Sequence, residues 1–283
     1  MSSATPSDAT SSDATPSDAT PSDRACYVYG IVPADAPGPD EAAGADGFVG
    51  VGDPPEPVRR VRHGDVAALV SEIDPRRPLG TPQDLIGHAR VLDAVAAGRT
   101  AVLPFRFGAV VRDPAAVTDD LLAPQGERFR SALEGLAGLA QFTIRGTYRE
   151  EAVLREIVEQ RPDIARLREE TAALPEDASR PQRIRLGELV SAELADRARA
   201  GADELLARLG PLAVATVRAD PSADQPVGAS FLVADDRWPE FTRATDELGA
   251  DWAGRIDLRL LGPLAPYDFA ARLVDAPGPR PWD

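Results

Sequence analysis

Leu212-Ala-Val-Ala-Thr-Val217 and Val227-Gly-Ala-Ser-Phe-Leu-Val233 are the two runs that decide the fold of this chain. Both are rich in β-branched and apolar residues, and the polar segment 220–225 between them is typical of a turn, so they predict two paired strands. A short helical pattern at Trp238–Leu248 and a final strand at Arg255–Leu261 follow.

Upstream of these runs, a strand around 142–148 precedes a long helical pattern that is interrupted at Pro162, Pro175 and Pro181. The last helical segment carries one apolar stripe at helical spacing: Leu186, Leu189, Val190, Leu194, Ala198, Leu205, Leu206 and Leu209. From residue 142 onward the order of elements is therefore β-α-β-β-α-β. This is the order of a ferredoxin-like domain, here with extra helices in the first crossover.

The N-terminal half mixes strands and helices. Tyr27–Val32 predicts a strand, and a turn at 63–65 leads from a short strand into Val66–Ile73, which predicts a hairpin. A helix is expected to be capped by Thr81 and to end at Gly98. Its apolar stripe is expected at Leu85, Ala89, Leu92 and Ala96.

Residues Val102–Val111 predict an edge strand or a bulged strand, because Pro104 cannot donate a ladder hydrogen bond. The alternating apolar residues are expected to share one face: Leu103, Phe105, Phe107 and Ala109. Arg106 is then expected on the other face. A helical stretch is predicted over Pro114–Ala140.

These patterns predict an α+β fold with two domains: an N-terminal mixed α/β domain over 24–139 and a C-terminal ferredoxin-like domain with a helical insertion over 140–270. Residues 1–23 repeat a Ser-Asp-Ala-Thr-Pro unit that lacks large apolar groups, which predicts a disordered tail. A phosphorylatable or partner-binding arm is the alternative for this segment. Residues 271–283 are expected to form a C-terminal tail.

Composition excludes several classes of function. The chain has 283 residues with 31 basic and 46 acidic side chains, a formal net charge of −15. This charge argues against nonspecific binding to nucleic acid or to an anionic membrane surface. Cys26 is the one cysteine, so an intrachain disulfide is excluded. The sequence contains no membrane-spanning apolar run and no signal-peptide pattern, and a cytosolic protein is the simplest interpretation.

Residues that carry chemistry are few. The two histidines, His63 and His88, lack metal-ligand spacing, and the glycine run at 47–52 is followed by prolines rather than by a phosphate-binding helix. We therefore expect no catalytic, cofactor or metal site and a protein that is not an enzyme. His88 is interpreted as a partly buried structural histidine, with a ligand or base as the alternative. Cys26 is expected to be a small core residue.

Two features are typical of surfaces for partners. The stripe of the last long helix, which includes Leu194 and Leu205, can pack inside the protein or remain partly free for another chain. The Pro-spaced segment Gly262–Phe269 can pack back on the domain or form a docking edge. Arg106 can either form an internal salt bridge between the domains or contact a partner.

Five segments together resemble a known family. They occur in one order: Tyr27–Val32; His88-Ala-Arg-Val-Leu92; Val102-Leu-Pro-Phe-Arg-Phe-Gly108; Arg185-Leu-Gly-Glu188; and Gly262-Pro with Pro266-Tyr-Asp-Phe269. In this combination the chain resembles the gas vesicle protein F/L family (GvpF and GvpL). It departs from the family pattern at Leu264-Ala265, where Trp-Pro is common, and at Gly228 and Gln141.

The resemblance implies a non-enzymatic accessory role in gas vesicle assembly. It implies binding of the small hydrophobic shell protein (GvpA-type) and of other accessory proteins, in the cytoplasm and at the gas vesicle, or a minor place in the vesicle wall. The candidate partner-binding residues are Arg106, Phe107, Leu194, Leu205, Pro266 and Tyr267. The alternative is a cytosolic ligand-binding or enzymatic ferredoxin-like protein with a pocket around His88 and Arg106.

Overall fold

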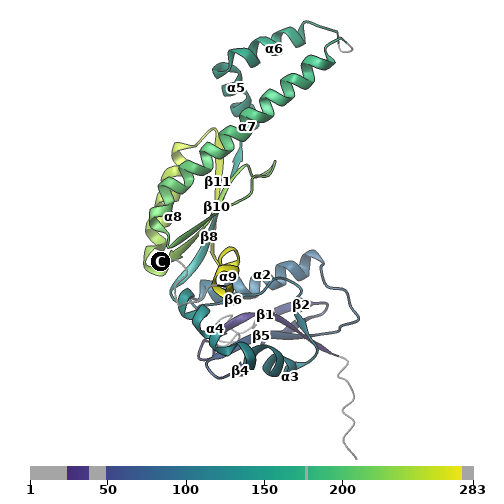
Figure 1. Cartoon of the computed structure of the whole chain (residues 1–283), viewed down its shortest axis with the longest axis vertical. Helices are drawn as coiled ribbons and strands as arrows, with labels where there is room; N and C mark the ends of the chain where they lie inside the picture. Colours follow the sequence, from purple (N-terminus) through teal and green to yellow (C-terminus); the bar gives the residue numbers. More distant parts are fainter. Residues whose placement is uncertain (1–23, 38–48, 176–177, 276–283) are drawn as a thin grey trace, which may run out of the picture.

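The computed structural model of the chain describes residues 24–37, 49–175 and 178–275. The molecule is elongated, with three parts in a row along its long axis (Figure 1). A first sheet with its helices lies at one end, a second sheet lies in the middle, and a helical arm extends from the other end. The expected tail at 1–23 and most of the expected C-terminal tail lie outside the described residues.

The first sheet is antiparallel. Its strands are β1 (Ala25–Pro33), β4 (Arg59–His63), β5 (Val66–Ile73), β6 (Leu103–Pro104) and β7 (Val110–Val111), in the order β4-β5-β1-β6, with β7 also paired to β1. The predicted hairpin is confirmed, since β4 and β5 pair in register. A small separate sheet pairs β2 (Val49–Gly52) with β3 (Pro55–Pro57). The glycine run at 47–52 and the prolines after it gave no strand pattern in the sequence.

Helices cover both faces of the first sheet. Helix α2 (Pro82–Ala97) covers one face, and α4 (Ala123–Leu136), preceded by α3 (Pro114–Ala116) and a π-helical stretch over Val117–Leu122, covers the other. Tyr27 and Tyr29 of β1 pack toward α2, whereas Cys26 packs toward α4. Because the strand is buried on both faces, its sequence is almost continuously apolar. Cys26 is a core residue, as expected.

Helix α2 begins and ends as predicted, with Thr81 as its N-cap and Gly98 as its C-cap, but its expected stripe is wrong at the start. Asp84 turns inward instead of Leu85, which is 49% exposed. The Asp84 carboxylate accepts hydrogen bonds from the N–H groups of Gly52 (3.0 Å) and Thr81 (3.0 Å), and from the Thr81 hydroxyl (2.8 Å). These bonds set the rotation of the helix, and Leu85 is left outside.

The predicted strand over Val102–Val111 is two short strands with a loop between them. Gly108 has a positive φ of 93°, and its N–H donates to the Tyr27 hydroxyl at 3.2 Å. The break destroys the alternation, so Phe105 packs on the α4 side of the sheet while Phe107 packs on the α2 side. The expectation that both rings share one face is therefore wrong. Pro104 supports the break, because it offers no N–H for a continuous ladder.

The second sheet contains β8 (Leu139–Tyr148), β9 (Ala215–Arg218), β10 (Val227–Ala234) and β11 (Ile256–Leu264). All neighbouring strands are antiparallel, in the order β11-β8-β10-β9. The predicted β-α-β-β-α-β order of elements is present. The predicted helix over Pro114–Ala140 is too long by a few residues, because β8 already begins at Leu139. Helices α7 and α8 (Trp238–Asp251) lie on the same side of this sheet (Figure 1).

The arm consists of α5 (Glu150–Gln160), α6 (Pro162–Ala172) and the N-terminal part of α7 (Arg180–Leu209). The apolar stripe of α7 serves two cores. Its first half, including Leu186 and Leu194, packs against α5 and α6, and its second half, including Leu205, packs on the second sheet. One continuous helix therefore joins the arm to the sheet.

The end of the chain returns to the first sheet. After β11, helix α9 (Tyr267–Asp275) lies beside α4 and β6. Ala265 is fully buried in the cluster under α2, and Phe269 is fully buried in the cluster under α4. The segment from 262 to 269 thus packs back on the molecule through Ala265, Pro266 and Phe269, and it joins the second sheet to the core of the first.

Candidate functional site

Four of the six candidate residues lie together, beside α9. The segment 103–109, which is β6 and the loop after it, borders with α9 a surface cleft of about 460 Å³, lined by Arg106, Phe107 and Tyr267 among others. Pro266 is buried next to it, at the start of α9. Arg106 is exposed and forms no ion pair with any residue that the structure describes. The expected salt bridge between the domains is therefore absent there, and the guanidinium is free to contact another molecule.

A buried polar cluster supports this cleft from behind. His88 is 4% exposed, and its Nδ1 lies 2.8 Å from the hydroxyl of Tyr27, which also accepts from the N–H of Gly108. The His88 ring packs against the rings of Phe107 and Tyr267, with centroids 5.7 and 6.1 Å away. Burial lowers the pKa of His88 and raises that of Tyr27. Both groups are therefore neutral at physiological pH and hold the loop by packing and hydrogen bonding.

His88 and Arg106 do not converge on a common pocket. His88 is enclosed among aromatic rings, whereas Arg106 faces solvent at the cleft. His88 is thus buried and hydrogen-bonded to Tyr27, and it does not form with Arg106 the ligand pocket that the enzymatic alternative requires. Among the described residues, no group of three or more His, Cys, Asp or Glu side chains could hold a metal ion.

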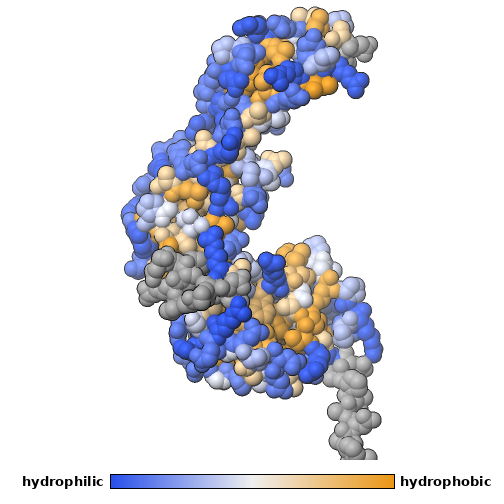
Figure 2. Space-filling view, in the orientation of Figure 1, coloured by the Kyte–Doolittle hydropathy of each residue, from blue (hydrophilic) through white to orange (hydrophobic). Residues whose placement is uncertain are grey.

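A second candidate surface is the groove of the arm. It has a volume of about 680 Å³, and its apolar lining comes from α5, α6 and α7: Leu154, Ile157, Val158, Ile164, Leu186 and Val190. Charged side chains, including Glu151, Arg155 and Arg168, border it. Figure 2 shows apolar side chains gathered between the helices of the arm and surrounded by hydrophilic ones. We call this feature the arm groove.

The two candidate residues of α7 differ in their surroundings. Leu194 is half-buried at the base of the arm, where it packs against the cluster of Val153, Ile157 and Ile164. Leu205 is fully buried between α7 and the second sheet. Leu205 is therefore a core residue and cannot be part of an exposed contact surface, because the stripe of α7 continues straight from the arm onto the sheet.

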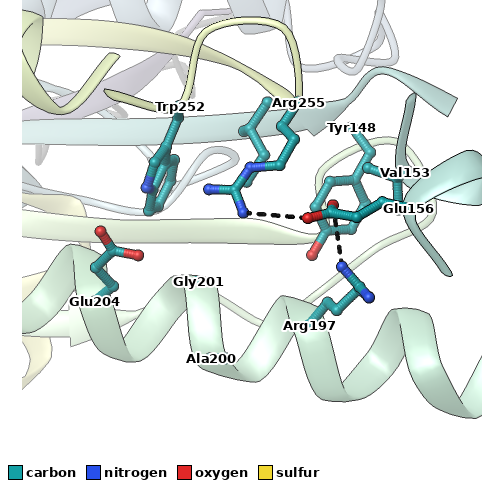
Figure 3. Close-up of a pocket in the computed structure, with 10 residues that line it drawn as sticks. Tyr148, Val153, Glu156, Arg197, Ala200, Gly201, Glu204, Trp252 and Arg255 are labelled. Carbon is teal, nitrogen blue, oxygen red and sulfur yellow. Dashed lines mark ion pairs between the residues drawn. The ribbon is translucent and has the colours of Figure 1, made fainter. Parts of the chain in front are cut away.

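A small pocket of about 150 Å³ lies where the arm meets the second sheet (Figure 3). Glu156 of α5 pairs with Arg197 of α7 at 3.1 Å and with Arg255, just before β11, at 3.9 Å. The Tyr148 hydroxyl is buried in the same place, and burial raises its pKa. This ion-pair cluster fixes the direction in which the arm leaves the sheet.

Sequence reasoning missed the polar residues that position these surfaces. Asp84, Glu156 and Asp268 each tie separate elements together, yet each occurs in an ordinary helical pattern. One usable signal was Thr81-x-x-Asp84, since an acid three residues after an N-cap is the pattern of a capping box. The partners of Glu156 and Asp268 lie far away in sequence, so no local pattern reveals them.

The fold and its surfaces define an α+β protein with three antiparallel sheets and a protruding helical arm. Residues 25–271 match the family model of the gas vesicle synthesis proteins GvpL/GvpF, and the chain belongs to this family.

Relatives and solved structures agree with this assignment. The chain is 35% identical over 249 residues to gas vesicle protein F of Streptomyces sp. (strain CB03234), covering 86% of this chain and 98% of the relative. It is 26% identical to gas vesicle protein F of Dolichospermum flosaquae, covering 86% and 96%.

The crystal structure of GvpF from Microcystis aeruginosa superimposes with a TM-score of 0.66 at 25% identity, covering 87% of this chain and 98% of that one. That of GvpF from Anabaena sp. PCC7120 has a TM-score of 0.68 at 24% identity, covering 87% and 98%, and supports the same fold. In the part of the chain that the structure describes, no helix is long and apolar enough to cross a membrane.

Proposed function

We propose that this chain is a non-enzymatic accessory protein of gas vesicle assembly that binds the small hydrophobic shell protein in the cytoplasm and at the growing vesicle. The observation that carries the proposal is the arm groove, an open apolar surface on a protein of the gas vesicle synthesis family. We further assign the second sheet, with α7 and α8, to the ferredoxin-like class.

The physical case rests on complementary surfaces. A shell subunit that assembles through apolar faces is prone to aggregate before assembly, because exposed apolar surface and unpaired strand edges favour association. A groove between helices receives the apolar side of an amphipathic segment, with the charged border selecting its orientation. The net charge of −15 keeps such a complex soluble.

The cleft beside α9 is proposed as a second contact surface, for other assembly factors. Arg106 offers a free guanidinium for a carboxylate or an aromatic ring, and Phe107 and Tyr267 supply the apolar wall. Pro266 and the buried His88 keep this wall rigid. Leu194 belongs to the arm surface, and Leu205 is omitted because it is buried.

The test is co-purification of the shell subunit after co-expression with the full chain. The variants L186D and V158D each place a carboxylate in the arm groove, and we expect both to lose retention of the shell protein. The matched control is I184D, because Ile184 lies on the same helix, is 57% exposed and does not line the groove.

Circular dichroism and thermal melting separate loss of binding from loss of fold. If L186D and V158D melt like the wild type and still retain the shell subunit, the groove is not its binding site. If the unaltered chain fails to retain the subunit, the proposed partner is wrong.

A further inference from the structure

Two arginines lie side by side on the second sheet. Arg145 of β8 and Arg259 of β11 are direct partners in the antiparallel register, and both are exposed. The next pair, Ile144 and Leu260, packs in the core under α7 and α8. Because side chains alternate along a strand, the two arginines point to the opposite face, which these helices leave uncovered.

This arrangement is unfavourable for the isolated chain. Like charges directly opposite each other destabilise an antiparallel pair. Neither arginine forms an ion pair with any described residue. The carboxylate two residues before Arg259 on the same face, Asp257, is already held by three hydrogen bonds from Arg149, at 2.7, 3.0 and 3.0 Å. On its other side Arg145 is opposite Gly228, which adds no side chain.

The chain does not lack acids with which to neutralise the pair. It has 46 acidic and 31 basic side chains, so an unneutralised arginine pair runs against the overall composition. A feature that breaks a local rule without a gain within the fold is most often a functional one. A carboxylate that docks on this face would neutralise the two guanidinium groups, since arginine binds carboxylates in a bidentate fashion.

We propose that Arg145 and Arg259 form a docking site for an acidic segment of a protein partner, which lies extended across the uncovered face of the second sheet. On this face the pair is flanked along β8 by the short polar side chains of Thr143 and Thr147, and along β11 by Leu261 and Asp257. The short side chains of β8 leave room for an extended peptide. The charges favour a peptide over a nucleic acid as the bound molecule. The net charge of −15 on the protein repels a nucleic acid, which carries one negative charge per nucleotide, whereas a short acidic peptide has only a few carboxylates, which the two arginines attract. The site is separate from the arm groove and does not depend on the function proposed for it.

The test uses fluorescence anisotropy of a fluorescein-labelled oligoglutamate peptide with the full chain at low salt. We expect binding that weakens with added salt, and a loss of affinity of about tenfold for each arginine replaced, in R145Q and R259Q. The control is the double variant R166Q/R243Q, which removes the same charge as R145Q/R259Q from exposed positions on α6 and α8. It should bind the peptide as the wild type does.

A second measurement tests whether the repulsion between Arg145 and Arg259 lowers the stability of the protein. Relief of repulsion should raise the melting temperature of R145Q or R259Q above that of the wild type. A lower melting temperature would assign the arginines a structural role and overturn the proposal. Equal peptide binding by the wild type and R145Q/R259Q, or no binding at all, would also overturn it. So would equally tight binding of oligothymidylate, which would make the surface a general polyanion site.

Discussion

Gln141 of β8 and Asp268 of α9 are joined by two hydrogen bonds, although 127 residues separate them in the sequence. The Gln141 Nε2 donates to Asp268 Oδ2 at 2.8 Å, and the backbone N–H of Asp268 donates to Gln141 Oε1 at 3.1 Å. The hydroxyl of Ser230 donates to the same carboxylate oxygen at 2.6 Å. Since α9 is anchored in the first core, these bonds fix the second sheet relative to the first.

Replacement of Gln141 by alanine should destabilise the protein by about 1–2 kcal/mol, because Gln141 is 4% exposed and its removal leaves the N–H of Asp268 without its acceptor. Urea unfolding measures the loss. Gln83→Ala is the control, since Gln83 is exposed in the first turn of α2 and should change stability little. Equal stabilities of the two variants would show that the junction does not depend on this pair.

Replacement of a tyrosine by phenylalanine should lower the stability of the protein at Tyr27 but not at Tyr267. Tyr27→Phe removes the hydroxyl that contacts His88 and accepts from Gly108, so it should cost about 1–3 kcal/mol. Tyr267→Phe removes a buried hydroxyl that has no hydrogen-bond partner among the described residues, and it should be neutral or slightly stabilising. Urea unfolding of both variants checks this. A larger loss for Tyr267→Phe would contradict the assigned hydrogen bonds.

Two helical glycines provide another matched pair. A Cβ at Gly87 of α2 would lie 2.9 Å from the carbonyl oxygen of Gly50, so Gly87→Ala should push β2 away and lower stability. A Cβ at Gly249 of α8 would meet nothing within 4 Å, and Gly249→Ala should stabilise by about 0.5–1 kcal/mol through helix propensity. Thermal melting of the two variants measures whether each substitution raises or lowers the stability. Stabilisation by Gly87→Ala would mean that β2 does not pack closely on α2.

Local patterns predicted the elements that depend on nearby residues. The hairpin of β4 and β5, the caps of α2 and the element order of the second sheet follow from turns, caps and periodicity. The stripe of α7 was also visible, but not its division between two cores, because periodicity shows which face is buried and not what buries it. The inward turn of Asp84 and the break at Gly108 depend on partners distant in sequence, so they could not be predicted.

The candidate partner-binding residues show the same limit of local patterns. Four of the candidate residues come from two separate segments of the sequence and lie at or beside one cleft: Arg106, Phe107, Pro266 and Tyr267. Leu205 lies in the same kind of pattern but is buried. An apolar residue on a helix has the same sequence signal in a core and at an interface, and tertiary packing alone separates the two.

The burial of His88 predicts a pH dependence of stability. Burial lowers the pKa of His88 below its ordinary value of 6.5, whereas His63 is exposed. As the pH falls below about 6.5, the unfolded chain takes up a proton that the folded chain resists, so the free energy of unfolding decreases. Above that pH both states are neutral at this position and the contribution of His88 is complete.

The measurement is urea unfolding of the wild type, His63→Gln and His88→Gln at about pH 7.5 and about pH 5.5, one on each side of the ordinary imidazole pKa. The wild type and His63→Gln should lose more stability on acidification than His88→Gln, whatever the starting stability of each variant. Carboxylates common to all three chains cancel in this comparison. An identical pH response in His88→Gln would mean that His88 titrates in the folded protein as freely as it does in the unfolded chain, and that the aromatic cluster around it is open to water.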